Sequence, residues 1–194
     1  MRSENVLPHN IKYKKENWEI GFHGTKYHVL ESIMKNGLLP SGAKVNGKEI
    51  KPPSHHIPLN TKVAGIQNWA RAIFVSPSIF YAGHPAYARK IISDADNKEY
   101  SVLIETRLRP GSYSKHPPTV VKYAQKNGEP TFVEYRIKVK DESNLIMRIE
   151  SKNNVIVTGI LFAKTEFLKN TKDYDKGDIF VNSKEEHSLF LTQN

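Results

Sequence analysis

Arg71 to Arg89, which reads RAIFVSPSIFYAGHPAYAR, is the stretch that decides how the rest of the chain is interpreted. The apolar run Ala72–Val75 predicts a buried strand, and this strand should end at Pro77 because proline cannot donate to a sheet ladder. Small and aromatic residues then crowd the turn, with Ser78 and Tyr81 among them. Such turns often carry sites for flat ligands. Taken alone, however, the same rings are more typical of a strand, a turn and a short helix packed in a core.

The composition sets limits on the class of protein. The chain has 194 residues, 38% hydrophobic and 25% charged, which is enough for one domain with a substantial core. It has no cysteine, so disulfides, thiol nucleophiles and cysteine-rich zinc sites are excluded. We expect a cytoplasmic or nuclear location and no membrane partner, because no run has signal-peptide or membrane-spanning character. The net charge of +9 favours anionic partners, but the lysines are scattered.

The first part of the chain predicts a strand, a turn and a helix. Residues 18–23 alternate as a strand and stop at Gly24-Thr25, and apolar residues in 26–36 then follow helical spacing up to a C-cap at Gly37. Residues 39–68 form a long segment rich in Gly, Pro, Lys and His, which we interpret as a wall beside a ligand cleft. The pair His55-His56 lies within it, and without a patterned carboxylate partner it predicts no metal site.

The remainder of the chain is rich in predicted strands. The pattern predicts strands at 100–108, 131–137, 145–150 and 155–163, an edge strand at 179–181, and a short helix ending near residue 92. We therefore expect an α+β fold in one domain, residues 1–194, with a flexible lead-in at 1–16 and a tail at 184–194. The chain lacks the GxGxxG, GxxxxGK[ST] and GxSxG patterns, so the common nucleotide-binding loops and the serine-hydrolase elbow are absent.

Three segments, in this order, carry a family resemblance. His23-Gly24-Thr25 ends a predicted strand and is followed by a helix and Gly37-Leu38; Ser78-Ile79-Phe80-Tyr81 follows a second strand; Glu134-Tyr135 lies in a third. Together they resemble the ADP-ribosyltransferase superfamily, specifically its poly(ADP-ribose) polymerase-like branch, over residues 18–163. A cholera-type branch fits less well, because His23 stands where that branch has an arginine and no Glu-x-Glu pair surrounds Glu134. The resemblance implies two packed, mainly antiparallel sheets that form an NAD cleft, with few helices.

The resemblance also implies residue roles. His23 would bind the adenosine ribose of NAD, and the Gly24 backbone, helped by the Ser78 hydroxyl, would hold the nicotinamide carboxamide. Tyr81 would stack on the nicotinamide ring. Glu134 would bind the nicotinamide ribose and stabilise the cation that forms as nicotinamide leaves. The catalytic set would thus be His23, Tyr81 and Glu134.

Two further positions complete the implied cofactor-binding set, namely Thr25 from the His-Gly-Thr element and Phe74 from the second strand. The family usually has a tyrosine where this chain has Phe74. Either the phenylalanine ring suffices for packing, or Tyr81 both stacks on the nicotinamide ring and replaces the tyrosine that the family usually has in the second strand. Tyr87 we interpret as a packing residue. On strand pattern alone, Glu134 would be an exposed residue paired with Arg136.

The implied activity is NAD-dependent mono-ADP-ribosyl transfer to a protein acceptor, with NAD as co-substrate and no metal. Three alternatives stay open from the residues alone. The first is an NAD glycohydrolase with water as acceptor, and the second transfers ADP-ribose to a nucleic acid. The third is an inactive module of the same fold that binds RNA or protein through its basic surface.

Overall fold

The computed structural model describes residues 17–53, 55–120, 132–140 and 143–168, which form a mixed α+β structure rich in antiparallel strands, as predicted. The strands are β1 (Glu19–Gly24), β2 (Lys44–Val45), β3 (Lys48–Glu49), β4 (Ala72–Val75), β5 (Lys90–Ile92), β6 (Glu99–Leu108), β7 (Tyr113–His116), β8 (Glu134–Lys138) and β9 (Val155–Lys164). The helices are η2 (Tyr27–Val29), α2 (Leu30–Asn36), α3 (Ile79–Ala82), α4 (Asn144–Asn154) and α5 (Thr165–Leu168). Within the described ranges, no helix has the length and apolar character needed to span a membrane.

The larger sheet is built around β6. One edge of β6 pairs with β1 and β5, and its other edge pairs with β9 over nearly its whole length. Both faces of β6 are covered: Val102 and Ile104 pack near Leu30 of α2, and Leu103 packs with Ala82 and Leu168 on the opposite face. Side chains of a strand alternate between its faces, so an uninterrupted apolar run such as Val102–Ile104 suits this central place.

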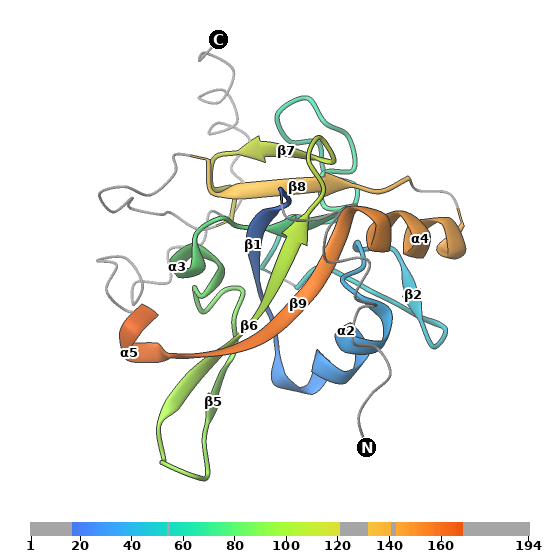
Figure 1. Cartoon of the computed structure of the whole chain (residues 1–194). Helices are drawn as coiled ribbons and strands as arrows, with labels where there is room; N and C mark the ends of the chain where they lie inside the picture. Colours follow the sequence, from blue (N-terminus) through green and yellow to red (C-terminus); the bar gives the residue numbers. More distant parts are fainter. Residues whose placement is uncertain (1–16, 54, 121–131, 141–142, 169–194) are drawn as a thin grey trace.

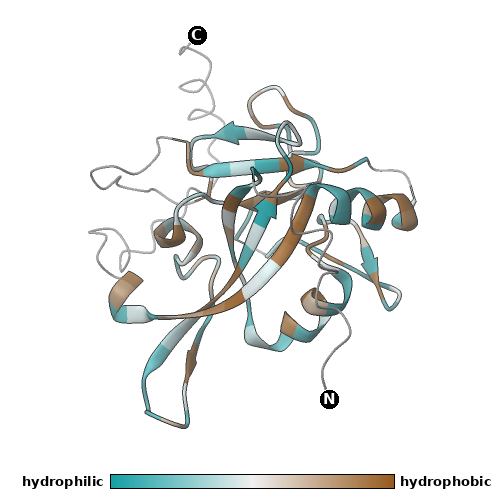
Figure 2. Cartoon of the chain, in the orientation of Figure 1, coloured by the Kyte–Doolittle hydropathy of each residue, from teal (hydrophilic) through white to brown (hydrophobic). Residues whose placement is uncertain are grey.

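The second main sheet has the order β4-β8-β7 and crosses the ends of the larger one, and β2 and β3 pair in a separate two-stranded sheet. In Figure 1, β7 and β8 run across the view, whereas β6 and β9 run down it. The two sheets share one cluster of buried side chains, to which β4 and β8 contribute Val75 and Ile137, and β6 and β9 contribute Leu108 and Val155. Figure 2 shows the matching brown segments along β9 and at the end of β8. The prediction of two packed, mainly antiparallel sheets is thereby confirmed.

In the part of the chain that the structure describes, one backbone bridge joins the two sheets edge to edge. The Phe22 N–H donates to the Ser76 carbonyl at 2.7 Å, and the Ser76 N–H donates to the Phe22 carbonyl at 2.8 Å. Antiparallel pairing would next place Gly24 opposite Phe74, yet the Phe74 carbonyl accepts a bond from the His23 ring instead. The strands therefore part at this point.

Two local predictions from the sequence are wrong. Residues 145–150 are not a strand but part of α4, which begins where the Ser143 hydroxyl accepts from the Ile146 N–H. The apolar run there looked like a strand, but Met147 is buried while Leu145 and Ile149 face outward. The residues up to Ile92 are not a helix, because Lys90–Ile92 pairs with β6 as β5. In both cases a tertiary contact overrides a short local pattern.

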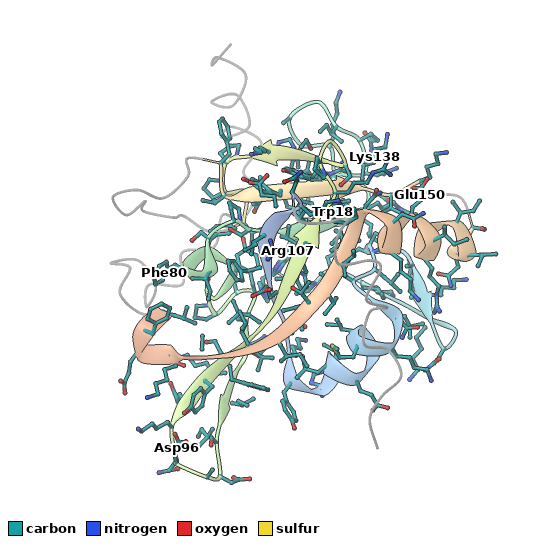
Figure 3. All side chains as sticks on the ribbon, in the orientation of Figure 1. Trp18, Phe80, Asp96, Arg107, Lys138 and Glu150 are labelled. Atoms are coloured by element: carbon teal, nitrogen blue, oxygen red, sulfur yellow. The ribbon has the colours of Figure 1, made fainter. Side chains whose placement is uncertain are left out.

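Several other predictions have mixed outcomes. The early helix begins as η2 and continues as α2 to Asn36, with Gly37 at the C-cap as predicted. Residues 113–116, where no strand was predicted, form β7. Helix α5 docks through a ring contact between Phe167 and Phe80, the latter labelled in Figure 3. The predicted lead-in (1–16), tail (184–194) and edge strand (179–181) lie outside the described residues.

Gly24 is fixed by packing. A Cβ atom at this position would lie 2.2 Å from the Ala82 carbonyl oxygen, 2.7 Å from the Tyr87 Cβ and 2.8 Å from the Ala88 nitrogen. These are mostly backbone atoms that cannot swing aside. The end of β1 thus touches the segment around α3 directly, and only glycine permits this contact.

We predict that Gly24→Ala lowers the free energy of unfolding by about 3 kcal/mol, because the backbone around Ala82 must shift to admit a methyl group. Gly159→Ala is the matched control, since a Cβ there meets only the Glu105 Cβ at 3.9 Å. The control should change stability by less than about 0.5 kcal/mol. Urea unfolding of both variants measures this, and equal stabilities would contradict the assigned packing.

Candidate functional site

A cavity of about 360 Å³ opens where the two sheets part. Its walls come from the end of β1, from β4, from α3 and the turn after it, from Glu134 at the start of β8, and from the long segment before β4. The predicted wall is real, because residues 50–53, 56 and 57 and Trp69-Ala70 line the cavity. Most of the lining is apolar, and its size falls within the range of small-molecule sites.

The parting of the strands turns the Gly24 backbone toward this cavity. Along a strand, the N–H and C=O groups of residues i and i+2 point to the same edge. Those of Phe22 point to Ser76, so those of Gly24 also point away from β6, whereas Thr25 donates to the Val102 carbonyl of β6. The sequence predicted that Gly24 lets a ligand approach the backbone. In the fold, the Gly24 N–H and C=O groups lie on the edge of β1 that points away from β6, where a ligand in the cavity can reach them.

Glu134 is the chemically distinctive residue of the cavity. It is 4% exposed and is the only carboxylate among the described lining residues. Its Oε1 accepts from the Tyr81 hydroxyl at 2.5 Å and from the Thr119 N–H at 3.1 Å, and its Oε2 accepts from the Thr119 hydroxyl at 2.6 Å. Burial raises the pKa of Glu134, and the bonds from Thr119 and Tyr81 oppose that rise. An exposed Glu134 paired with Arg136 is therefore not what is found.

Arg136 points elsewhere. Its Nε donates to the Trp69 carbonyl at 3.0 Å, and its guanidinium carbon lies 5.2 Å from the centre of the Trp69 ring. Both residues are buried. The arginine thereby fixes Trp69 in the cavity wall.

Two tyrosines form a directed chain toward Glu134. The Tyr81 hydroxyl has one proton, which goes to the carboxylate, so the Tyr87 hydroxyl, 2.7 Å from the Tyr81 oxygen, donates to that oxygen or to the carboxylate itself. Burial, together with the nearby charge of Glu134, raises the pKa of both tyrosines well above their usual range. Both hydroxyls thus remain donors, and Tyr87 is more than the packing residue that the sequence suggested.

His23 lines the cavity in one defined tautomer. Its Nδ1 lies 2.8 Å from the Phe74 carbonyl, which can only accept, so Nδ1 bears the proton and the neutral ring leaves Nε2 as an acceptor. Burial lowers the pKa of His23, opposed by this bond to Phe74. A hydroxyl group of a ligand is the natural partner for such a nitrogen.

The other predicted residues divide into two groups. Thr25 and Phe74 line the cavity, and the Phe74 ring packs against Trp69 with centroids 5.8 Å apart. Ser78 does not line it: this buried side chain caps α3 by accepting from the Tyr81 N–H at 3.2 Å, and Ser76 lines the cavity instead. A contact of the Ser78 hydroxyl with a ligand stays a prediction, which this placement does not favour.

Sequence reasoning missed Thr119. Strand β7 pairs with β8 so that His116 lies opposite Glu134, and the chain then carries Thr119 back to the carboxylate. No local pattern signals this contact, because it depends on the register of two strands. The hydroxyl of Tyr87 and the side chains of His56 and Trp69 were missed for the same reason, although the density of aromatics around Tyr87 was visible.

Comparisons with known proteins give no match: no family model, no curated protein and no solved structure is significantly similar to the chain. Among the described residues, no group of three or more His, Cys, Asp or Glu side chains could hold a metal ion. The site itself therefore has to indicate the function. Its geometry offers a buried carboxylate, a neutral imidazole and flat rings around one apolar cavity.

We predict that Thr119→Val lowers the free energy of unfolding at pH 7 by about 2 kcal/mol, since it removes a hydrogen bond to a buried carboxylate. Thr158→Val is the matched control, because Thr158 donates to Glu105 at 2.8 Å on the exposed surface. That control should change stability by less than about 0.5 kcal/mol.

The same pair of variants tests the electrostatics. The bond from the Thr119 hydroxyl opposes the effect of burial, so its loss should raise the pKa of Glu134 further, while the backbone N–H of residue 119 still donates to Oε1. A carboxyl NMR titration of wild type and Thr119→Val measures the change. A lowered pKa, or no change, would contradict the hydrogen-bond geometry.

Proposed function

We propose that this chain has an ADP-ribosyltransferase-like fold and cleaves the bond between nicotinamide and ribose in NAD, transferring ADP-ribose to an acceptor as a mono-ADP-ribosyltransferase. The observation that carries the proposal is the buried carboxylate of Glu134, which faces an apolar cavity and is held by Tyr81 and Thr119. It stands in the same cavity as His23 and Gly24, and these residues were the ones indicated by the resemblance.

The chemistry suits this arrangement. Loss of nicotinamide leaves positive charge on the ribose, and a fixed carboxylate in surroundings of low dielectric constant stabilises such charge more than water does. The Oε2 atom of Glu134 accepts from the Thr119 hydroxyl, and because a carboxylate oxygen has two lone pairs it can also accept from a ribose hydroxyl. The hydrogen bonds from Thr119 and Tyr81 lower the pKa of Glu134 against the larger effect of burial, and so favour the ionised state that the reaction requires.

The remaining parts of the cavity fit the donor molecule. The outward N–H and C=O of Gly24 match a carboxamide, which needs one acceptor and one donor. The rings of Tyr81, Tyr87 and Phe74 provide flat surfaces for nicotinamide. The Nε2 of His23 accepts from a sugar hydroxyl. Phe74 has no hydroxyl, and the hydroxyl of Tyr81 reaches Glu134 in its place.

We predict that Glu134→Ala and Glu134→Gln each lower the rate of NAD cleavage at least about 100-fold, because the developing charge loses its partner. The experiment incubates labelled NAD with wild type and variants, with and without protein acceptors, and measures free and bound ADP-ribose. Glu105→Ala is the matched control, since this glutamate lies on β6 outside the cavity. Far-UV circular dichroism checks that each variant folds.

Free ADP-ribose alone would identify a glycohydrolase, and label on nucleic acid would change the acceptor class. Unchanged cleavage in both Glu134 variants would contradict the assigned role. Failure of wild type to bind NAD, together with salt-sensitive RNA binding, would instead identify a binding module.

A further inference from the structure

A second cavity, an open groove of about 600 Å³, lies at the opposite end of β8 from Glu134. It is formed by the end of β8, the turn that follows β6 and the C-terminal end of α4, and its charged lining residues are Arg109, Lys138, Lys140 and Glu150. Figure 3 labels Lys138 and Glu150, which line it from β8 and α4. Lys138 is four residues from Glu134, about 13 Å along the strand. This basic groove shares no lining residue with the cavity around Glu134.

The positive charge of the basic groove is largely unpaired. Arg109, Lys138 and Lys140 are all exposed, so their charged ends are open to a ligand. Among the residues that the structure describes, neither the Arg109 guanidinium nor the Lys138 ammonium has a hydrogen bond or an ion pair. The C-terminal end of α4 contributes only about half a negative charge. Three cations therefore outweigh this end and the one carboxylate.

The wall that carries Arg109 is fixed. The Arg109 N–H donates to the Asn154 carbonyl at 2.9 Å, and this bond joins the turn to the end of α4. The Arg109 carbonyl accepts from the Ser112 hydroxyl at 2.7 Å and from the Ser112 N–H at 3.1 Å. Gly111, with φ of +75°, permits the tight turn between them. The backbone is thus held while the guanidinium stays free to bind.

The Lys140–Glu150 pair gives up its cation easily. The Lys140 Nζ lies 3.8 Å from the Glu150 Oε1, and the lysine side chain is 68% exposed. Such an exposed pair contributes little to stability. The Glu150 Oε2 also accepts from the Lys140 N–H at 2.7 Å, so the carboxylate keeps a partner when the ammonium turns to a ligand.

The lining restricts the ligand to a class. Pro110 is the one apolar side chain of the described wall, and the uncharged remainder is polar or glycine. Protein partners are usually anchored by apolar or aromatic groups, and bases stack on aromatic rings, so this wall suits neither. A guanidinium and two ammonium groups suit phosphate oxygens, which arginine binds in a bidentate manner. The backbone of a nucleic acid offers such oxygens in a row.

We propose that the basic groove binds the phosphate backbone of a nucleic acid strand, with Arg109, Lys138 and Lys140 contacting phosphate oxygens and no base being read. The inference does not depend on the proposed function, because the groove and the cavity share no residue. It gives the scattered net charge of the chain one defined place of action.

The test measures fluorescence anisotropy of a labelled single-stranded oligouridylate at several salt concentrations. For wild type, the logarithm of the association constant should fall with that of the salt concentration with a slope of about −2, since each contact on a single strand contributes about −0.7. Arg109→Ala and Lys138→Ala should each reduce the size of this slope by about 0.7. The double variant should bind about tenfold more weakly at low salt. Oligoadenylate should bind within about threefold of oligouridylate, because phosphate contacts carry no sequence information.

Lys48→Ala is the matched control. Lys48 is an exposed cation on β3, and it lines neither the basic groove nor the cavity. It should leave the slope and the affinity within about twofold of wild type. A second double variant, Arg109→Lys with Lys138→Arg, keeps both charges and should keep most of the affinity. All these positions are exposed, where substitutions seldom unfold a protein, and circular dichroism checks this.

Three outcomes would overturn the inference. The first is wild type without salt-dependent RNA binding. The second is an equal effect of Lys48→Ala and the groove variants, which would spread binding over the whole surface. The third is displacement of the RNA by polyglutamate as readily as by unlabelled RNA, which would indicate an acidic protein. Glu134→Gln should bind RNA like wild type, so failure of the proposed function and failure of this inference are distinguishable.

Discussion

Within the described residues, the backbones of the two sheets pair only where Phe22 and Ser76 exchange two hydrogen bonds, and the cavity depends on that limit. Had the pairing continued, Gly24 would face Phe74 and the space would be closed by a regular sheet. Instead the His23 ring donates a hydrogen bond to the Phe74 carbonyl. Strand β4 then diverges from β1, and this edge of β1 faces the cavity. The same junction thus serves both the fold and the site. The bridge joins the two sheets, and because the pairing stops after it, the backbone groups of Gly24 are left to bind a ligand.

Glu134 poses the main energetic problem of the structure. Burial of a carboxylate is costly unless hydrogen bonds compensate it. Thr119 supplies two donors and Tyr81 a third, with Tyr87 orienting the Tyr81 hydroxyl from behind. The donors come from α3 and from the segment after β7, so the burial of the carboxylate is compensated only when these segments pack against the start of β8.

Local sequence patterns correctly predicted the elements whose tertiary contacts agree with the pattern. The run around Leu103 became the central strand because its apolar residues are needed on both faces. The run at 145–150 had a similar apolar content, yet the cap at Ser143 and the single buried face through Met147 made it a helix. Strand β5 was missed because three residues are too few to show a pattern, and its pairing with β6 decides it.

The sequence by itself determined the α+β class, the main strands, and the segments that carry His23, Gly24, Tyr81 and Glu134, because hydrophobic period, turn residues and short motifs are local properties. Only the tertiary structure decided that Ser78 caps a helix, that Tyr87 joins a hydroxyl chain, and that Thr119, Trp69 and His56 meet the others at one cavity. These contacts depend on strand register and on how two sheets part. Such features follow from the packing of distant segments, which no single stretch of sequence encodes.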